Sequence, residues 1–127
     1  MTAVGGSELE ATAAFLDAVA RRDYDAIAAS FAPEARLRAL VPTTVRDDVG
    51  PEAIAARYRF WYGDLEDFAL LETDEEAVCD RIRLRYRVRG TDPDEGPIVQ
   101  EQTAYATVED GRITVLDLVC SGSRPAP

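Results

Sequence analysis

The sequence contains neither histidine nor lysine, so all fourteen of its basic residues are arginine. Without histidine, Ser-His-Asp and Cys-His catalysis and the imidazole-bound zinc and iron sites are excluded. Without lysine, Schiff-base chemistry and a P-loop are excluded. Proton transfer would depend on Asp, Glu, Tyr, Cys or water. We therefore expect no metal site and no cofactor.

Further absences limit the partners and the compartment. The two cysteines, Cys79 and Cys120, form no CxxC motif and predict reduced thiols in a cytoplasmic protein. No basic leader precedes an apolar stretch, and no apolar run approaches the ~20 residues of a membrane span. The net charge of −10 disfavours nucleic acid and anionic membrane surfaces as partners.

The 127 residues predict a single domain whose ordered core covers about residues 7–120. Helical signals fill the first half of the chain. Ser7 and Glu10 form a predicted capping box at the start of a first helix. Asp23 begins a second helix that Pro33 ends, and Gly50-Pro51 opens a third.

The second half of the chain predicts strands. Residues 81–89 alternate arginine with apolar side chains, which is the strongest strand signal in the sequence. Other predicted strands cover residues 34–41, 68–72, 98–108 and 113–120, with a polar loop over 42–49, an Asp-Gly turn within 109–112 and a loose tail over 121–127. Helices followed by strands predict an α+β fold.

Several segments resemble one protein superfamily when taken in order. They are residues 15–27 (FLDAVARRDYDAI), 30–35 (SFAPEA), Gly50 with Ile54, and 109–113 (EDGRI). Together, over about residues 8–120, they resemble the nuclear transport factor 2-like (NTF2-like) superfamily, including ketosteroid isomerase and the SnoaL-like polyketide cyclases. The resemblance implies a cone-shaped fold, in which a strongly curved antiparallel sheet wraps around three N-terminal helices. It also implies a hydrophobic pocket and a homodimer formed through the sheet.

The ketosteroid isomerase mechanism does not transfer to this sequence. That enzyme uses an Asp base, with a Tyr and a protonated Asp as oxyanion donors. In ungapped local alignment the Tyr position falls on Phe15, the base position on Ala39 and the protonated acid on Thr103. All three chemical groups are absent, so we reject this mechanism for the chain.

Strand alternation within such a cone predicts which side chains face the pocket. On the strand over 98–108 it places Val99, Glu101, Thr103 and Tyr105 inward. The same aromatic and aliphatic side chains would also form an ordinary core, which is the alternative at each position. The predicted substrate-binding residues are Phe15, Val19, Ala39, Trp61, Tyr86, Thr103, Leu116 and Leu118.

Glu101 is the predicted proton-transfer residue. A carboxylate facing an apolar interior would have a raised pKa, which suits a general acid or base. Tyr58 or Tyr105 is the predicted hydrogen-bond donor to a developing enolate or alkoxide oxygen. The alternative for Glu101 is a solvated position at the rim of the cone, or an ion pair with an arginine.

We therefore predict a protein that binds a small, apolar, oxygenated molecule. If it is an enzyme, we expect cofactor-free acid–base chemistry: isomerisation, cyclisation or dehydration. The alternatives are a non-catalytic ligand-binding module and a pure dimerisation module. The arginines of 81–89 should face outward, because the opposite register would expose four apolar side chains at about 1.5–3 kcal/mol each. That outer face could be salt-bridged, form a homodimer interface or bind an anion.

Overall fold

A computed structural model of the chain describes residues 5–126. In chain order, its elements are α1 (Gly6–Ala20), α2 (Tyr24–Ala29), β1 (Phe31–Val41), β2 (Thr44–Val49), α3 (Pro51–Tyr62), β3 (Glu66–Val78), β4 (Arg81–Asp92), β5 (Gly96–Glu109), β6 (Arg112–Cys120) and β7 (Arg124–Pro125).

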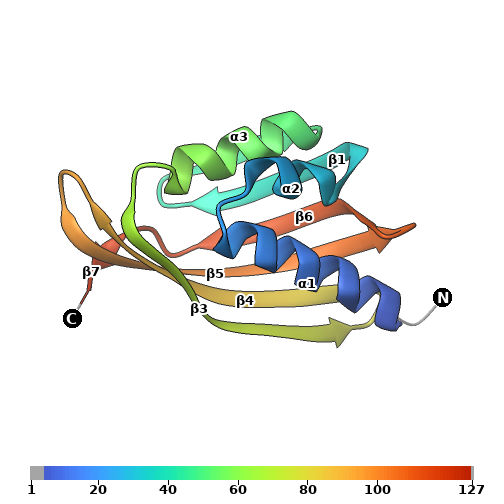
Figure 1. Cartoon of the computed structure of the whole chain (residues 1–127). Coiled ribbons are helices and arrows are strands. Elements are labelled where there is room, and N and C mark those ends of the chain that lie inside the picture. The colour runs from blue at the N-terminus through green and yellow to red at the C-terminus, as the bar shows by residue number, and fades with distance from the viewer. Residues whose placement is uncertain (1–4, 127) are drawn as a thin grey trace.

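The three helices lie on one face of a curved sheet (Figure 1). Six strands follow the order β2-β1-β6-β5-β4-β3, and β7 pairs with β5. The predicted α+β class and the sheet wrapped around three helices are confirmed. The sheet is mixed, however, since β1 and β6 are parallel while the other pairs are antiparallel. The expectation of a wholly antiparallel sheet was therefore wrong at this one pair.

Helix α3 begins where the sequence predicts. Gly50 precedes it at φ 92° and ψ 153°, a conformation that is essentially restricted to glycine. Pro51 occupies the first helical position, where its missing N–H costs nothing. Ile54, Tyr58 and Tyr62 recur at four-residue spacing and are buried against the sheet.

The first two helices start and stop somewhat differently from the prediction. The N–H of Gly5 donates to Oε2 of Glu8 at 2.9 Å, so the cap of α1 lies two residues before the predicted Ser7–Glu10 box. Asp23 caps α2 as predicted by accepting the N–H of Ala26 at 3.1 Å. Pro33 does not end this helix, because the chain has already joined β6 through the Phe31–Ile113 pair.

Two segments predicted as irregular are strands. Residues 44–49 form β2, which pairs with β1 along its whole length, although the sequence predicts a polar loop there. Arg124 and Pro125 of the predicted loose tail pair with β5. Both strands depend on backbone hydrogen bonds to a neighbouring strand and bury few apolar side chains, so sequence alternation gives little sign of them.

The arginines of β4 lie on the outer face of the sheet, as predicted. Arg81 pairs with Asp117 at 3.2 Å and Arg87 with Glu101 at 2.9 Å, while Arg83 pairs with Glu76. The intervening apolar side chains Ile82, Leu84, Tyr86 and Val88 are buried beneath the helices. Within residues 5–126, no helix combines the length and the apolar character needed to cross a membrane.

Candidate functional site

A row of polar side chains crosses the inner face of the sheet. Tyr86 on β4 is opposite Gln102 on β5, and Gln102 is opposite Cys120 on β6. Residues directly opposite each other on paired strands share a face, so these three side chains are neighbours. Tyr86 and Gln102 are buried, whereas Cys120 is half-buried.

Helix α3 covers this row with two further tyrosines. Tyr58 and Tyr62 lie four residues apart, one helical turn, and both are buried. Phe15 of α1 packs edge-on against Tyr58, with ring centroids 5.7 Å apart. Trp61 packs against the same ring at 5.2 Å. The interior of the fold is thus lined by aromatic rings that carry hydroxyl groups.

The hydroxyl groups and the amide form a directed hydrogen-bond chain. The Tyr86 hydroxyl donates to Oε1 of Gln102. The Tyr58 and Tyr86 hydroxyl oxygens lie 3.3 Å apart. Because Tyr86 uses its proton on Gln102, Tyr58 must be the donor in this second bond. The chain therefore runs from Tyr58 through Tyr86 to the amide oxygen of Gln102.

Two polar groups beside this chain lack a hydrogen-bond partner among residues 5–126. They are Nε2 of Gln102, whose residue is 2% exposed, and the hydroxyl of Tyr62. A buried donor without a partner costs about 1–3 kcal/mol. Such groups are candidates for contacts with a ligand or an ordered water molecule.

Burial keeps all three interior tyrosines protonated. Desolvation raises the pKa of Tyr58, Tyr62 and Tyr86 above the ordinary tyrosine value, because the phenolate form would be charged in an apolar surrounding. Each hydroxyl is therefore protonated at neutral pH.

The interior has hydrogen-bonding groups but no charge. Among the described residues, the buried polar side chains other than tyrosine are Thr12 and Gln102, and no carboxylate or guanidinium is fully buried. Nor do three or more His, Cys, Asp or Glu side chains of residues 5–126 gather as a possible metal site. This arrangement can recognise a polar group by hydrogen bonds.

The structure brings together most of the side chains predicted to line a pocket. Trp61 is half-buried against Tyr58. The remaining members of this inward group are buried in the interior, namely Phe15, Val19, Ala39, Tyr58, Tyr86, Leu116 and Leu118. Their inward orientation agrees with the sequence analysis, while their role in binding a substrate stays a prediction.

The predicted orientation of β5 was wrong by one residue. Glu101, Thr103 and Tyr105 lie on the outer face, and Glu101 and Tyr105 are exposed. Glu101 pairs with Arg87 at 2.9 Å and with Arg124 at 3.2 Å. The hydrogen bond and the charge of Arg87 lower the pKa of Glu101, contrary to the predicted rise. An exposed, ion-paired carboxylate cannot transfer protons within the interior.

Gln102 is the interior residue that the sequence analysis missed. The register with β4 places Ala106, Ala104 and Gln102 opposite the buried Ile82, Leu84 and Tyr86. These small or polar residues face inward because α1 packs over this part of the sheet. Their weak hydrophobicity concealed the correct alternation, whereas Val99 and Tyr105 suggested the opposite one. Pairing β5 in register with the unambiguous strand 81–89 would have revealed it.

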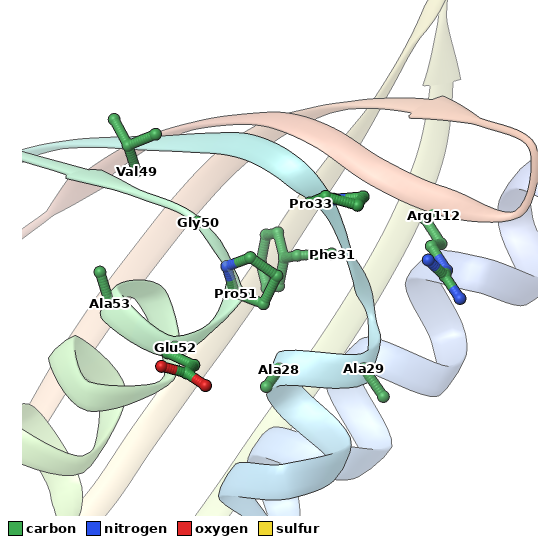
Figure 2. Close-up of a pocket in the computed structure, with 10 residues that line it drawn as sticks. All are labelled: Ala28, Ala29, Phe31, Pro33, Val49, Gly50, Pro51, Glu52, Ala53 and Arg112. Carbon is green, nitrogen blue, oxygen red and sulfur yellow. The ribbon is translucent and has the colours of Figure 1, made fainter.

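A second candidate region lies at the other end of α3. A groove of about 740 Å³ is bounded by the end of α2, the starts of β1, α3 and β6, and the end of β2 (Figure 2). Phe31, Pro33 and Pro51 supply apolar surface there, and Glu52 and Arg112 supply charge. It contains none of the predicted site residues and no buried polar group without a partner, so the interior row is the stronger candidate.

The family model of the SnoaL-like domain matches residues 12–116. The chain belongs to the SnoaL-like family. This match includes α2, α3, most of α1 and all strands up to the middle of β6, so the interior row up to Gln102 lies within it. No match was found among curated proteins.

Solved structures with this SnoaL-like fold come from several bacteria. A protein with a ketosteroid isomerase-like fold from Catenulispora acidiphila, in complex with trimethylamine, is 15% identical, with a TM-score of 0.74 over 88% of this chain and 85% of its own. A proposed polyketide cyclase from Xanthomonas campestris is 23% identical, with a TM-score of 0.72 over 89% of both chains. An LEH-like epoxide hydrolase from M. tuberculosis is 17% identical, with a TM-score of 0.70 over 91% and 83%. At these identities the similarity establishes the fold alone.

Proposed function

We propose that this SnoaL-like protein binds a small, uncharged molecule in its interior and holds an oxygen atom of that molecule against Gln102. The observation that supports the proposal is the unpartnered Nε2 of Gln102, which is buried beside an otherwise satisfied hydrogen-bond chain. A ligand oxygen would accept this N–H and remove the cost of a buried, unsatisfied donor.

The direction of the hydrogen-bond chain favours an acceptor as the ligand group. The protons of Tyr58 and Tyr86 are directed toward Oε1 of Gln102, so the end of the chain presents amide N–H groups. The Tyr62 hydroxyl offers a second donor. A carbonyl, ether or hydroxyl oxygen fits these donors.

The absence of buried charge among residues 5–126 favours an uncharged ligand. Transfer of a carboxylate or ammonium group from water to such an interior is strongly unfavourable without a partner of opposite charge. The surrounding rings of Phe15, Tyr58 and Trp61 favour an apolar or aromatic ligand body.

Acid–base catalysis is the second candidate. Isomerisation, cyclisation or dehydration needs a donor to a developing oxyanion, and the protonated, unpartnered hydroxyl of Tyr62 favours it. Those reactions also need a base, and the predicted base Glu101 lies on the outer face. We therefore propose ligand binding as the activity of this interior.

We also propose a homodimer through the outer face of the sheet. Exposed large apolar side chains on this face include a group formed by Leu40, Val45, Tyr105 and Val119. They border a groove of about 320 Å³ that Arg38 and Asp117 also line. Apolar side chains surrounded by both charge signs are compatible with contact between two copies of one surface.

Binding can be tested with a matched pair of probes, 2-acetonaphthone and 2-naphthoate. They share the aromatic body, and one carries a ketone where the other carries a carboxylate. Trp61 is the single tryptophan and packs against Tyr58, so its fluorescence reports binding in the interior. Titration of Trp61 fluorescence gives a Kd for each probe. We expect the Kd of the ketone to be at least about tenfold lower than that of the carboxylate, because the anion loses its hydration on binding.

Gln102→Leu provides the residue-specific arm of this experiment. We expect it to weaken ketone binding about five- to tenfold, the value of one lost hydrogen bond. Gln102→Glu should also weaken ketone binding, because it removes the amide N–H, and it should keep or increase the preference for the neutral probe, because a carboxylate at this position repels 2-naphthoate. Equal affinity of the ketone for the natural chain and for Gln102→Leu would contradict the proposed contact. Absence of ketone binding to the natural chain would contradict the proposed function.

A further inference from the structure

Gln102 and the three interior tyrosines are closed to solvent. Tyr58, Tyr62, Tyr86 and Gln102 are each at most 3% exposed. If the interior binds a ligand, as proposed above, some part of its wall must move before the ligand can reach Gln102. The segment that moves should be one whose separation from the fold costs little free energy.

The segment after β6 continues along β5, beside the Cys120 end of this row. Cys120 is opposite Gln102, whereas Arg124 is opposite Val99 and Pro125 is opposite Ile98. The register therefore contains one extra residue between Cys120 and Arg124, which makes a bulge at residues 121–123. Gly122 has a φ of 78° in this bulge, a value that favours glycine.

Two contacts join the bulge to the interior. The N–H of Gly122 donates to Sγ of Cys120 at 3.4 Å. Nε2 of Gln100 donates to Oγ of Ser123 at 2.8 Å. Gln100 is opposite the buried Val88, so its side chain is on the inner face, two residues from Gln102. Gly122 and Ser123 are thus hydrogen-bonded to two half-buried side chains, Cys120 within the row and Gln100 beside it.

The same segment contains the shortest strand of the fold. Strand β7 has two residues, whereas β4 has twelve. Short paired segments at a chain end open at much lower free-energy cost than central strands. The segment is nevertheless fitted to its site, because a Cβ on Gly122 would lie 2.5 Å from Cγ of Pro42 in the turn between β1 and β2.

We propose that residues 121–126 form a gate, which separates from β5 to admit a ligand to the interior and then closes over it. This inference rests on the proposed binding function. The gate opens by breaking the Gln100–Ser123 hydrogen bond, the Arg124–Glu101 ion pair and the β7 pairing, which includes the hydrogen bond from the Ala126 N–H to the Pro97 oxygen. Gly122 supplies the hinge. Its opening exposes Cys120 first and then the neighbouring Gln102.

Thiol labelling tests the closure without any ligand. Cys79 is exposed and serves as an internal standard for the half-buried Cys120. In the presence of iodoacetamide, peptide mass spectrometry gives the ratio of the two labelling rates. We expect this ratio, Cys120 to Cys79, to rise at least about tenfold in a chain ending at Ser121 and about threefold in Ser123→Ala. Ser7→Ala, at the other end of the chain, should leave it unchanged.

Circular dichroism and thermal unfolding establish whether the shortened chain is folded. If it is not, Ser123→Ala, which removes one hydroxyl, decides the labelling test. A Cys120 to Cys79 ratio that is the same in the natural chain and in the folded shortened chain would overturn the gate.

Binding kinetics separate the gate from the proposed function. Stopped-flow quenching of Trp61 by 2-acetonaphthone should show association and dissociation rates that both rise at least about tenfold in the shortened chain, with Kd changing less than about threefold. Binding with unchanged rates would show that the ligand enters elsewhere and would overturn the gate. Absence of binding to every chain would contradict the proposed function, and the labelling ratio would still decide whether residues 121–126 close the interior.

Discussion

At the scale of single residues, Gln102 is the exception on its strand. Its neighbours on the same face, Ala104 and Ala106, are small and apolar, whereas Gln102 brings an amide into a buried site. A buried amide with a free N–H destabilises the folded chain unless a partner satisfies it. Local features that cost stability are expected mainly at functional sites, so the amide of Gln102 is consistent with a role in ligand binding.

Glu101, one residue earlier, leads to a prediction about pH. Arg87, and to a smaller degree Arg124, lowers the pKa of Glu101 in the folded chain. A lowered folded-state pKa contributes stability above the unfolded-state pKa, and this contribution is lost as the pH falls through the folded-state value. We expect Glu101→Gln to be less stable than the natural chain at about pH 7, and the difference to shrink as the pH falls below the unfolded-state pKa of about 4.3.

Urea unfolding at several pH values measures this difference. Glu52→Gln is the matched control, because Glu52 has no ion pair among residues 5–126. Since Glu101 faces solvent, Glu101→Gln should also bind 2-acetonaphthone as the natural chain does. A loss of ketone binding in this variant would show that the carboxylate takes part in the site after all.

At the scale of elements, α3 determines where the interior hydroxyl groups lie. It carries Tyr58 and Tyr62, and its start depends on the backbone of Gly50. We expect Gly50→Ala to destabilise the chain by about 1–3 kcal/mol, because alanine is strained at φ 92° and ψ 153°. The neighbouring atoms leave room for a methyl group, so the cost should come from the backbone alone.

Urea unfolding of Gly50→Ala and of Gly6→Ala separates this strain from the general effect of replacing glycine. Gly6 lies in the first turn of α1, with nothing near its missing side chain. Gly6→Ala should be neutral or stabilising, since alanine favours the helix. Equal stability of Gly50→Ala and the natural chain would contradict the proposed role of the backbone at Gly50.

The elements also show what sequence reasoning can and cannot predict. The strand over 81–89 was predicted with its faces correctly assigned, because charged and strongly apolar residues alternate there. On β5 the inner positions include Gln102 and Ala104 while Val99 and Tyr105 lie outside, so hydrophobicity favoured the wrong face. Which face of β5 is inner depends on pairing with β4, and pairing is a property of the sheet rather than of the segment.

The candidate site was also predictable only in part. The lining from α1, α3, β4 and β6 followed from strong helical and strand periodicities, which placed Phe15, Tyr58 and Tyr86 correctly. Gln102 and Tyr62 were missed, because a single polar or aromatic residue carries no sign of being left without a hydrogen-bond partner. Whether a polar group lacks a partner depends on how β4, β5, β6 and α3 pack together, which no single segment of the sequence shows.

At the scale of the whole molecule, the outer face of the sheet should determine whether the chain associates. Val119 is 54% exposed near the centre of that face. If two copies meet there, Val119→Glu would place two carboxylates in the contact. We expect the free energy of dimerisation to become less favourable by at least about 2 kcal/mol. Sedimentation velocity over a range of concentrations measures this change.

Phe60→Ser is the control for loss of exposed apolar surface, since Phe60 is exposed on α3 on the opposite side of the sheet. It should leave the association unchanged. A natural chain that sediments as a monomer at high concentration would contradict the homodimer without affecting the proposal for the interior.

The one parallel strand pair has a consequence for how the chain reaches this structure. Strands β3 to β6 form a meander of local hairpins, and β1 and β2 form another hairpin. The β1–β6 pair is the sheet's sole junction between them, and it joins Phe31 to Ile113 from near the two ends of the chain. Closing so long a loop is slow, so the β1–β6 junction should form last, after both hairpin systems have acquired their own structure.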